Sequence, residues 1–286
     1  MGKHCEKMTE DLQLREYSPK TCKEYVRCAR AYVAYHRRPP EEMGEREIRE
    51  FLLYLRLERE LSSASRKMHV AAIKFLYDTT LGRPEVIARI PWPKVEQTLP
   101  DILSGTEVEA LFEAVDSPKY RAILMTTYGT GLRLQEVCKL EVGDIDSRRM
   151  LIHVRQGKGR RDRYVMLPER ILLMLRRYWA TERPAKPFLF PGRDPDTCVS
   201  TSAVQDTVRA AAKKAGISKR VTPHVLRHTF ATHLLELGTD LRVIQMLLGH
   251  RSVQTTMRYT RVAGQHIARV QSPIDVLGTP KQRTIG

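Results

Sequence analysis

The stretch Thr222-Pro-His-Val-Leu-Arg-His-Thr-Phe-Ala-Thr-His-Leu-Leu-Glu236 combines a helix start, an apolar stripe and a cluster of cations. Thr222 suits an N-cap, Pro223 the first helical position and Gly238 the residue beyond a helix, which predicts a helix of about four turns. At about 100° per residue, the apolar face consists of Leu226, Phe230, Leu234 and Leu237. The opposite face collects His224, Arg227, His228 and Ala231. Two imidazoles and a guanidinium near unsatisfied helical N–H groups predict a site for an anion such as phosphate.

The net charge of the whole chain also favours an anionic ligand. Its 286 residues include 49 Lys and Arg against 33 Asp and Glu, a net charge of +16. An excess spread along the chain favours a polyanionic partner bound with salt-dependent affinity, although a soluble protein can also simply be basic. No signal peptide and no apolar run of about 18 residues is found, so we expect a cytoplasmic protein without a membrane segment. The five cysteines lack a C-x-x-C pair and are expected to be reduced packing residues.

The first third of the chain predicts a small helical bundle after a short polar lead. Helices are expected from Ser18-Pro19 to about residue 38, from 45 to 60, and from 62 or 63 to 80. The third is expected to bury Met68, Ala71, Phe75 and Leu76 and to expose Arg66, Lys67, His69 and Lys74. These basic residues suit contacts to a DNA backbone, although a solvated helix surface explains them equally well locally.

A proline-rich segment at about residues 90–104 predicts a linker. We therefore expect one domain over residues 1–97 and a second over 98–286, with a frayed tail at 263–286. The second domain is expected to start with a capping box from Thr106 to Glu109. The fold class expected for the chain is mainly α with a small β-hairpin.

Two further places in the second domain carry unexpected cations. After a helix at 118–128 and a turn at Gly129–Gly131, Arg133 falls in the first turn of the next helix, where the helix dipole disfavours a cation. Strands at 150–155 and 163–167 flank a turn that carries Lys158 between glycines, followed by Arg160 and Arg161. Such a lysine can be a mere solubiliser, can enter a DNA groove or can donate a proton. Further helices are expected at 168–179, 202–215, 241–248 and 253–260.

Five motifs occur together in the second half of the chain, and they are Thr130-Gly-Leu-Arg133-Leu-Gln-Glu136, Gly157-Lys158-Gly159, His224-x-x-Arg227-His228, Leu248-Gly-His250 and Tyr259-Thr260. In order and spacing they resemble the tyrosine recombinase (phage integrase) family over residues 106–262. The helical N-terminal part is similar to that family's core-binding, SAM-like domain, so the resemblance implies that domain followed by an α+β catalytic domain.

The resemblance implies an enzyme that cleaves and rejoins duplex DNA through a 3′-phosphotyrosyl intermediate, without metal or nucleotide cofactor. Tyr259 would be the nucleophile, Arg133 and Arg227 would hold the phosphate, and Lys158 would protonate the leaving 5′-oxygen. His224 and His250 would donate hydrogen bonds or carry protons, with Glu136 and His228 as support. Four protomers would align two sites, with the segment after Tyr259 packed on a neighbour. The expected DNA contacts are Arg66, Lys67, Lys74, Arg160 and Arg161.

Several alternatives stay open. A type IB topoisomerase-like enzyme would use the same chemistry on one duplex, and a catalytically silent DNA-binding protein would lack the full residue set. His224 and His228 at i, i+4 could hold a metal, but no third ligand of fitting spacing is found. Within the family, the size resembles Xer-type resolvases. Other segments resemble integron integrases, which carry an additional helical insertion before the second arginine. The 66 positions from Lys158 to His224 (224 − 158) are too few to include that insertion. The short lead before the first expected helix disfavours an arm-binding phage integrase.

Overall fold

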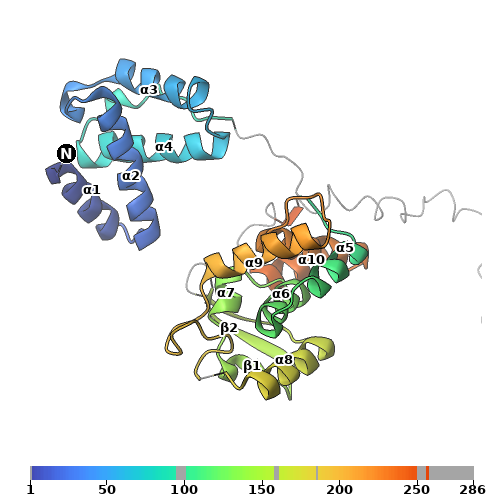
Figure 1. Ribbon diagram of the computed structural model, residues 1–286. Coiled ribbons are helices and arrows are strands. Elements are labelled where there is room, and N and C mark those ends of the chain that lie inside the picture. Colours follow the sequence, from blue (N-terminus) through green and yellow to red (C-terminus); the bar gives the residue numbers. More distant parts are fainter. Residues whose placement is uncertain (1, 95–100, 158–160, 185, 250–255, 258–286) are drawn as a thin grey trace, which may run out of the picture. The chain divides into compact units, whose positions relative to one another are not determined.

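Helices dominate both units of the chain, Met1–Thr98 and Leu99–Gly286, and the sheet is small (Figure 1). The computed structural model describes residues 2–94, 101–157, 161–184, 186–249 and 256–257. The predicted mainly α fold class is confirmed. All five cysteines are free thiols, and four of them are buried. The helix expected at 253–260 and the tail at 263–286 lie outside the described residues, apart from Thr256 and Met257.

The first unit is a helical bundle around an aromatic core. Its elements are α1 Gly2–Leu14, α2 Pro19–His36, η1 Pro40–Glu42, α3 Glu45–Leu57, α4 Ser63–Phe75, η2 Leu76–Thr80 and η3 Pro84–Val86. Ser18 caps α2, because its hydroxyl accepts from the Thr21 N–H at 3.2 Å. In the core, the hydroxyl groups of Tyr32 and Tyr77 lie 3.0 Å apart, and Tyr77 also donates to the Pro40 carbonyl at 3.0 Å. This chain of hydrogen bonds satisfies both buried phenols.

Two expectations for the first unit are wrong. The supposed polar lead is helix α1, which buries Cys5, Met8 and Leu12 against α2 and η2. The face of the third helix is also shifted, because His69 is buried at 5% exposure whereas Met68 is 38% exposed. Residues 76–80 continue α4 as a π-helix. Before that segment, α4 buries His69, Val70, Ala72 and Ile73, so the face that meets the core is turned by about one residue from the expected one.

The second unit is built around α6 and α10. Its elements are α5 Gly105–Glu113, α6 Pro118–Thr130, α7 Leu134–Cys138, η4 Val142–Asp144, β1 Ile145–Asp146, β2 Leu151–Gly157, β3 Arg161–Met166, α8 Glu169–Glu182, α9 Thr201–Lys214, α10 Pro223–Glu236 and α11 Leu241–Leu248. Helix α6 packs against α8 and α10, and α10 lies beside α9 (Figure 1). Helix α11 also packs against α10. The capping box lies two residues earlier than expected, since Ser104 rather than Thr106 caps α5 and pairs with Glu107.

The sheet has the antiparallel order β1-β2-β3, and β1 was not expected. The β2–β3 register pairs Ile152 with Val165 and Val154 with Arg163. Directly paired residues point to the same face, so Arg163 shares the buried face of the hairpin with Ile152, Val154 and Val165. On the other face His153 and Tyr164 stack at 4.9 Å between ring centroids.

Candidate active site

Helix α10 begins as its sequence predicts but is buried on more sides than expected. The Thr222 hydroxyl accepts from the Val225 N–H at 3.2 Å, and Pro223 occupies the first position. The expected exposed cationic face is wrong for Arg227 and His228, which are only 2% and 7% exposed. The reason is that α6, α9 and α11 surround the helix. The expected apolar face is wrong for Leu237, which follows the end of α10 and is 80% exposed.

The buried Arg227 guanidinium reaches two main-chain carbonyls from distant parts of the chain. Its Nη1 donates to the Gly131 carbonyl at 2.5 Å, and its Nη2 donates to the Leu248 carbonyl at 2.6 Å. Gly131 ends α6 with a positive φ of 64°, and a Cβ there would lie 2.4 Å from the Phe230 ring. The turn therefore requires glycine, which lets α6 end against α10 beside the arginine.

Arg133, at the start of α7, also donates a hydrogen bond to the end of α11. It is the N-cap residue of α7, and its Nη2 donates to the Gly249 carbonyl at 3.1 Å. Its Nη1 donates to Oε1 of Glu136 at 2.8 Å. The Arg133 side chain is about one quarter exposed. A cation at a helix start, which the sequence marks as unusual, is thus held by a carboxylate on the next turn.

The carbonyls of Leu247, Leu248 and Gly249 each accept a hydrogen bond from a different arginine. Arg163 Nε donates to Leu247 at 3.2 Å, and Leu248 and Gly249 receive Arg227 and Arg133. These carbonyls belong to the C-terminal turn of α11, which Gly249 closes with a φ of 60°. Carbonyls at a helix C-terminus lack helical N–H partners and carry partial negative charge, so they can solvate buried cations. The turn gathers the three guanidiniums immediately before His250.

Glu136 holds two of these arginines together. Its Oε1 accepts from Arg133 Nη1 and from Arg163 Nη1, the latter at 3.0 Å. Its Oε2 accepts from the Arg133 main-chain N–H at 2.8 Å and from Arg163 Nη2 at 2.7 Å. Burial by itself raises the pKa of Glu136, but the hydrogen bonds and charge of Arg163, with those of Arg133, outweigh burial and lower the pKa to about 2. Glu136 is therefore a fixed anion at neutral pH.

Arg163 was not among the residues selected from the sequence, although a signal for it exists. In the run Arg163-Tyr-Val165-Met-Leu167, strict alternation puts a charged residue in register with two apolar ones. A charge on the apolar face of a strand needs a buried partner. Glu136, whose side chain is 9% exposed and which follows Arg133 by three residues, is that partner.

The remaining candidate residues are only partly described. His224 is exposed near the start of α10, and its ring contacts that of His228 edge to face with centroids 4.5 Å apart. Arg161 begins β3. The residues Lys158, Arg160, His250 and Tyr259 lie outside the described residues. Within the described ranges, no group of three or more His, Cys, Asp or Glu side chains is placed to share a metal ion.

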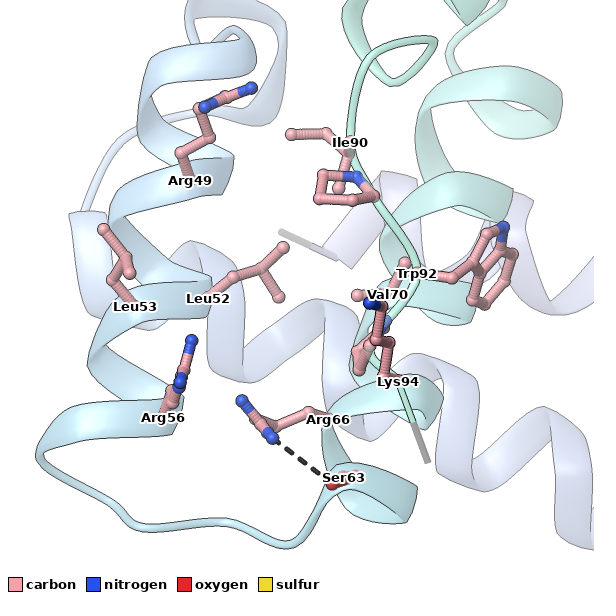
Figure 2. Close-up of a pocket in the computed structure, with 12 residues that line it drawn as sticks. Arg49, Leu52, Leu53, Arg56, Ser63, Arg66, Val70, Ile90, Trp92 and Lys94 are labelled. Carbon is pink, nitrogen blue, oxygen red and sulfur yellow. Dashed lines mark hydrogen bonds between the residues drawn. The ribbon is translucent and has the colours of Figure 1, made fainter. Parts of the chain in front are cut away.

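In the first unit, the expected DNA contacts Arg66, Lys67 and Lys74 all lie on α4. The ammonium groups of Lys67 and Lys74 lie 6.0 and 5.2 Å from the ring centroid of Trp92, which is 49% exposed. Arg66 instead lines a groove of about 510 Å³ between α3, α4 and residues 90–94. Figure 2 shows Leu52 and Arg66 pointing into that groove, whereas Trp92 points away from α3. The role of the three cations in DNA binding stays a prediction.

Comparison with known proteins identifies the class of protein that this fold and this cluster define. The phage integrase family model matches residues 101–266, and the model of the phage integrase N-terminal SAM-like domain matches residues 5–85. The chain belongs to the phage integrase family, the tyrosine recombinases, which are DNA strand-transferring enzymes of site-specific recombination. Among the described residues, no helix is both long and apolar enough to cross a membrane.

Individual relatives cover most of the chain. It is 42% identical over 276 residues to "Putative integrase/recombinase y4qK" of Sinorhizobium fredii, spanning 96% of this chain and 89% of that protein. It is 38% identical over 248 residues to the tyrosine recombinase XerA of Thermococcus onnurineus, spanning 85% and 87%. The solved structure of the XerH site-specific recombinase bound to a palindromic difH substrate, a post-cleavage complex, matches with a TM-score of 0.72 over 88% of this chain and 79% of that chain. At 23% identity that likeness shows the fold.

Proposed function

We propose that this chain is a site-specific recombinase that cleaves and rejoins duplex DNA through a 3′-phosphotyrosyl intermediate, with four protomers acting on two sites. In cleavage, the Tyr259 hydroxyl oxygen attacks the scissile phosphorus and the bond from phosphorus to the 5′-oxygen breaks. Lys158 gives its proton to the departing 5′-oxygen, and the tyrosine proton leaves through a nearby imidazole. Rejoining runs the same steps backwards with a 5′-hydroxyl from the partner strand.

Arg133 and Arg227 hold the non-bridging oxygens in this proposal. Guanidinium groups remain protonated and grip phosphate with two parallel N–H groups, so they can stabilise the charge that develops on those oxygens. His224 and His250 are assigned as hydrogen-bond donors or proton carriers beside the phosphate, and His228 and Glu136 as their support.

One observation carries the proposal. Arg227 from α10 and Arg133 from the start of α7 lie far apart in the sequence, yet they donate to the consecutive carbonyls of Leu248 and Gly249. His250 follows directly in the chain. Three of the five motifs that carry the family resemblance thus meet at one turn. A recombinase needs such convergence, because the scissile phosphate must touch all of these groups at once.

The proposed partner is double-stranded DNA, and the net charge of +16 favours it. Contacts to the backbone are assigned to Arg66, Lys67 and Lys74 of the first unit and to Arg160 and Arg161 of the second. Protomers would associate through the segment after Tyr259. The proposed location is the cytoplasm, where the DNA substrate is accessible.

The test uses the full chain and a nicked duplex taken from the DNA that flanks the gene. Loss of the short strand beyond the nick traps the covalent complex, which is measured as a protein–DNA band that survives denaturation. We expect Tyr259→Phe to abolish the band while DNA affinity, measured by gel shift, is unchanged. Tyr164→Phe, an exposed tyrosine of β3, is the matched control and should form the band normally.

Two further results decide between functions. If the Tyr259→Phe protein still forms the adduct, the nucleophile is another residue. If the wild-type chain forms the adduct and relaxes a supercoiled plasmid but never joins two sites, the chemistry stands and the topoisomerase-like alternative replaces recombination.

A further inference from the structure

Arg163 is a charged residue on the inner face of the hairpin. It lies opposite Val154 in the register, its neighbour Val165 on that face is 1% exposed, and its own side chain is 13% exposed. Burying a guanidinium removes it from water, which is unfavourable unless hydrogen bonds and an opposite charge replace the water. The hydrogen bonds of Arg163 to both oxygens of Glu136 and to the Leu247 carbonyl serve that end.

These contacts tie three parts of the candidate active site together. Arg163 belongs to β3, and Lys158 precedes this strand in the sequence. Glu136 belongs to α7, whose N-cap is Arg133. Leu247 belongs to the last turn of α11, before His250. The Arg163 side chain also packs against the α11 turn, because a Cβ on Gly249 would lie 3.1 Å from Arg163 Cδ.

The geometry at Glu136 shows what Arg163 does to Arg133. A carboxylate facing a single guanidinium prefers to pair with both of its terminal nitrogens. Here Arg163 occupies one acceptor position on each carboxylate oxygen, at 3.0 and 2.7 Å. Arg133 therefore gives only Nη1 to Glu136 and turns Nη2 towards the Gly249 carbonyl. Without Arg163, both nitrogens of Arg133 would be drawn to the carboxylate.

The charges lead to the same conclusion. Glu136 is ionised and lies between two guanidiniums, so this group of three side chains carries a net positive charge. Removal of Arg163 would leave one guanidinium neutralised by one carboxylate. An approaching phosphate would then meet a pair with no net charge, in a largely buried place where charge interactions are weakly screened.

We propose that Arg163 is a positioning residue for strand cleavage, which keeps Arg133 free of a two-pronged pairing with Glu136 and so directs it to the scissile phosphate. This inference rests on the proposed function of Arg133. Arg163 touches no reacting atom in this proposal, and it acts through Glu136 and the α11 turn.

The experiment measures single-turnover cleavage of the nicked duplex at saturating DNA by the full chain. We expect Arg163→Met to slow cleavage by at least about 10-fold, and by no more than the roughly 10²–10³-fold loss seen when a direct oxyanion donor is removed. In a Glu136→Gln background the carboxylate charge is gone, so adding Arg163→Met should change the rate less than about 2-fold, because coupled residues are not additive. DNA affinity should be unchanged throughout.

Arg155→Met is the matched control. Arg155 belongs to the neighbouring strand β2 and also pairs with two carboxylates, Glu141 at 3.1 Å and Asp144 at 2.6 Å, neither of which is Glu136. Its loss should leave the cleavage rate unchanged. If Arg163→Met is poorly folded by circular dichroism, Arg163→Lys replaces it. That variant keeps the charge but places a single ammonium group where a planar fork is needed, and it should still slow cleavage.

The outcomes separate the two proposals. The positioning role is overturned if the rate losses of Glu136→Gln and Arg163→Met are additive. It is also overturned if Arg163→Met or Arg163→Lys cleaves at the wild-type rate. In both cases cleavage by the wild-type chain still upholds the proposed function. A wild-type chain that never cleaves overturns the proposed function instead.

Discussion

Replacement of Gly131 by alanine tests whether the arginine cluster depends on the close contact between α6 and α10. Gly131 has a φ of 64°, which costs a residue with a Cβ about 1–2 kcal/mol. The new Cβ would also lie 2.4 Å from two ring carbons of Phe230, which is 5% exposed and is packed with Ala231 and Leu248. Overpacking of this kind costs about 1–3 kcal/mol. The sum predicts a loss of about 2–5 kcal/mol in unfolding free energy.

The matched control is Gly216→Ala. Gly216 follows α9 with a φ of 69°, and nothing lies within 4 Å of a Cβ built there. It should therefore lose only the backbone contribution of about 1–2 kcal/mol. The assay is urea unfolding in a Trp92→Phe background, in which Trp179 of α8 is the single tryptophan and reports on the second unit. Equal losses for Gly131→Ala and Gly216→Ala would show that the Phe230 contact does not restrain the turn, and the structural reasoning would be refuted.

Two further predictions concern the cap of α5 and the buried His69. Ser104→Ala should destabilise the second unit by about 1 kcal/mol, whereas Thr106→Ala should be nearly neutral, since Ser104 makes the capping bond; equal effects in urea unfolding would contradict the observed cap. Burial, with the charges of Arg27 and Arg59, lowers the pKa of His69, whose Nδ1 has no hydrogen-bond partner among the described residues. As the pH falls below about 6.5, His69 takes up a proton in the unfolded chain before it does so in the native one. The first unit therefore loses stability until the pH reaches the lower pKa of His69 in the native state. His69→Phe should flatten this loss between about pH 7 and 5 when Trp92 fluorescence is followed in a Trp179→Phe background, and an unchanged slope would show that His69 is not its source.

Helix ends with strong local signals could be predicted from the sequence. The start of α2 at Ser18-Pro19, the start of α10 at Thr222-Pro223 and the end of α11 at Gly249 are as expected. A cap depends on the conformation and hydrogen bonds of a few adjacent residues, which the sequence states directly. Where two overlapping segments fit the same capping pattern, the sequence does not show which of them forms the cap. Both Ser104-Gly-Thr-Glu107 and Thr106-Glu-Val-Glu109 have the capping-box pattern. The hydrogen bond from the Leu103 N–H to the Thr229 hydroxyl, at 3.1 Å, fixes the chain just before Ser104.

Features that depend on packing were the ones missed. Helix α1 has few apolar residues, and Cys5, Met8 and Leu12 are buried only because α2 and η2 cover them. The cationic face expected on α10 failed for the same kind of reason. Helical periodicity tells which residues share a face, but not how many neighbours cover it. For the candidate site, Arg133, Glu136 and Arg227 were selected from the sequence as candidates, whereas the attachment of Arg133 and Arg227 to one turn was not predicted.

That attachment explains how cationic side chains can be buried together. Arg133, Arg163 and Arg227 lie within hydrogen-bonding distance of three consecutive carbonyls, and Glu136 supplies an ionised carboxylate to two of them. The last carbonyls of a helix lack N–H partners within that helix, so those of α11 can accept from the arginines without breaking it. The fold thus fixes the guanidiniums in place, and under the proposed function this arrangement would limit the reorganisation needed when negative charge develops on a bound phosphate. Arg227 is a buried charge on α10 and so departs from an amphipathic pattern. In this arrangement it links α10 to the turn that precedes His250 in the sequence.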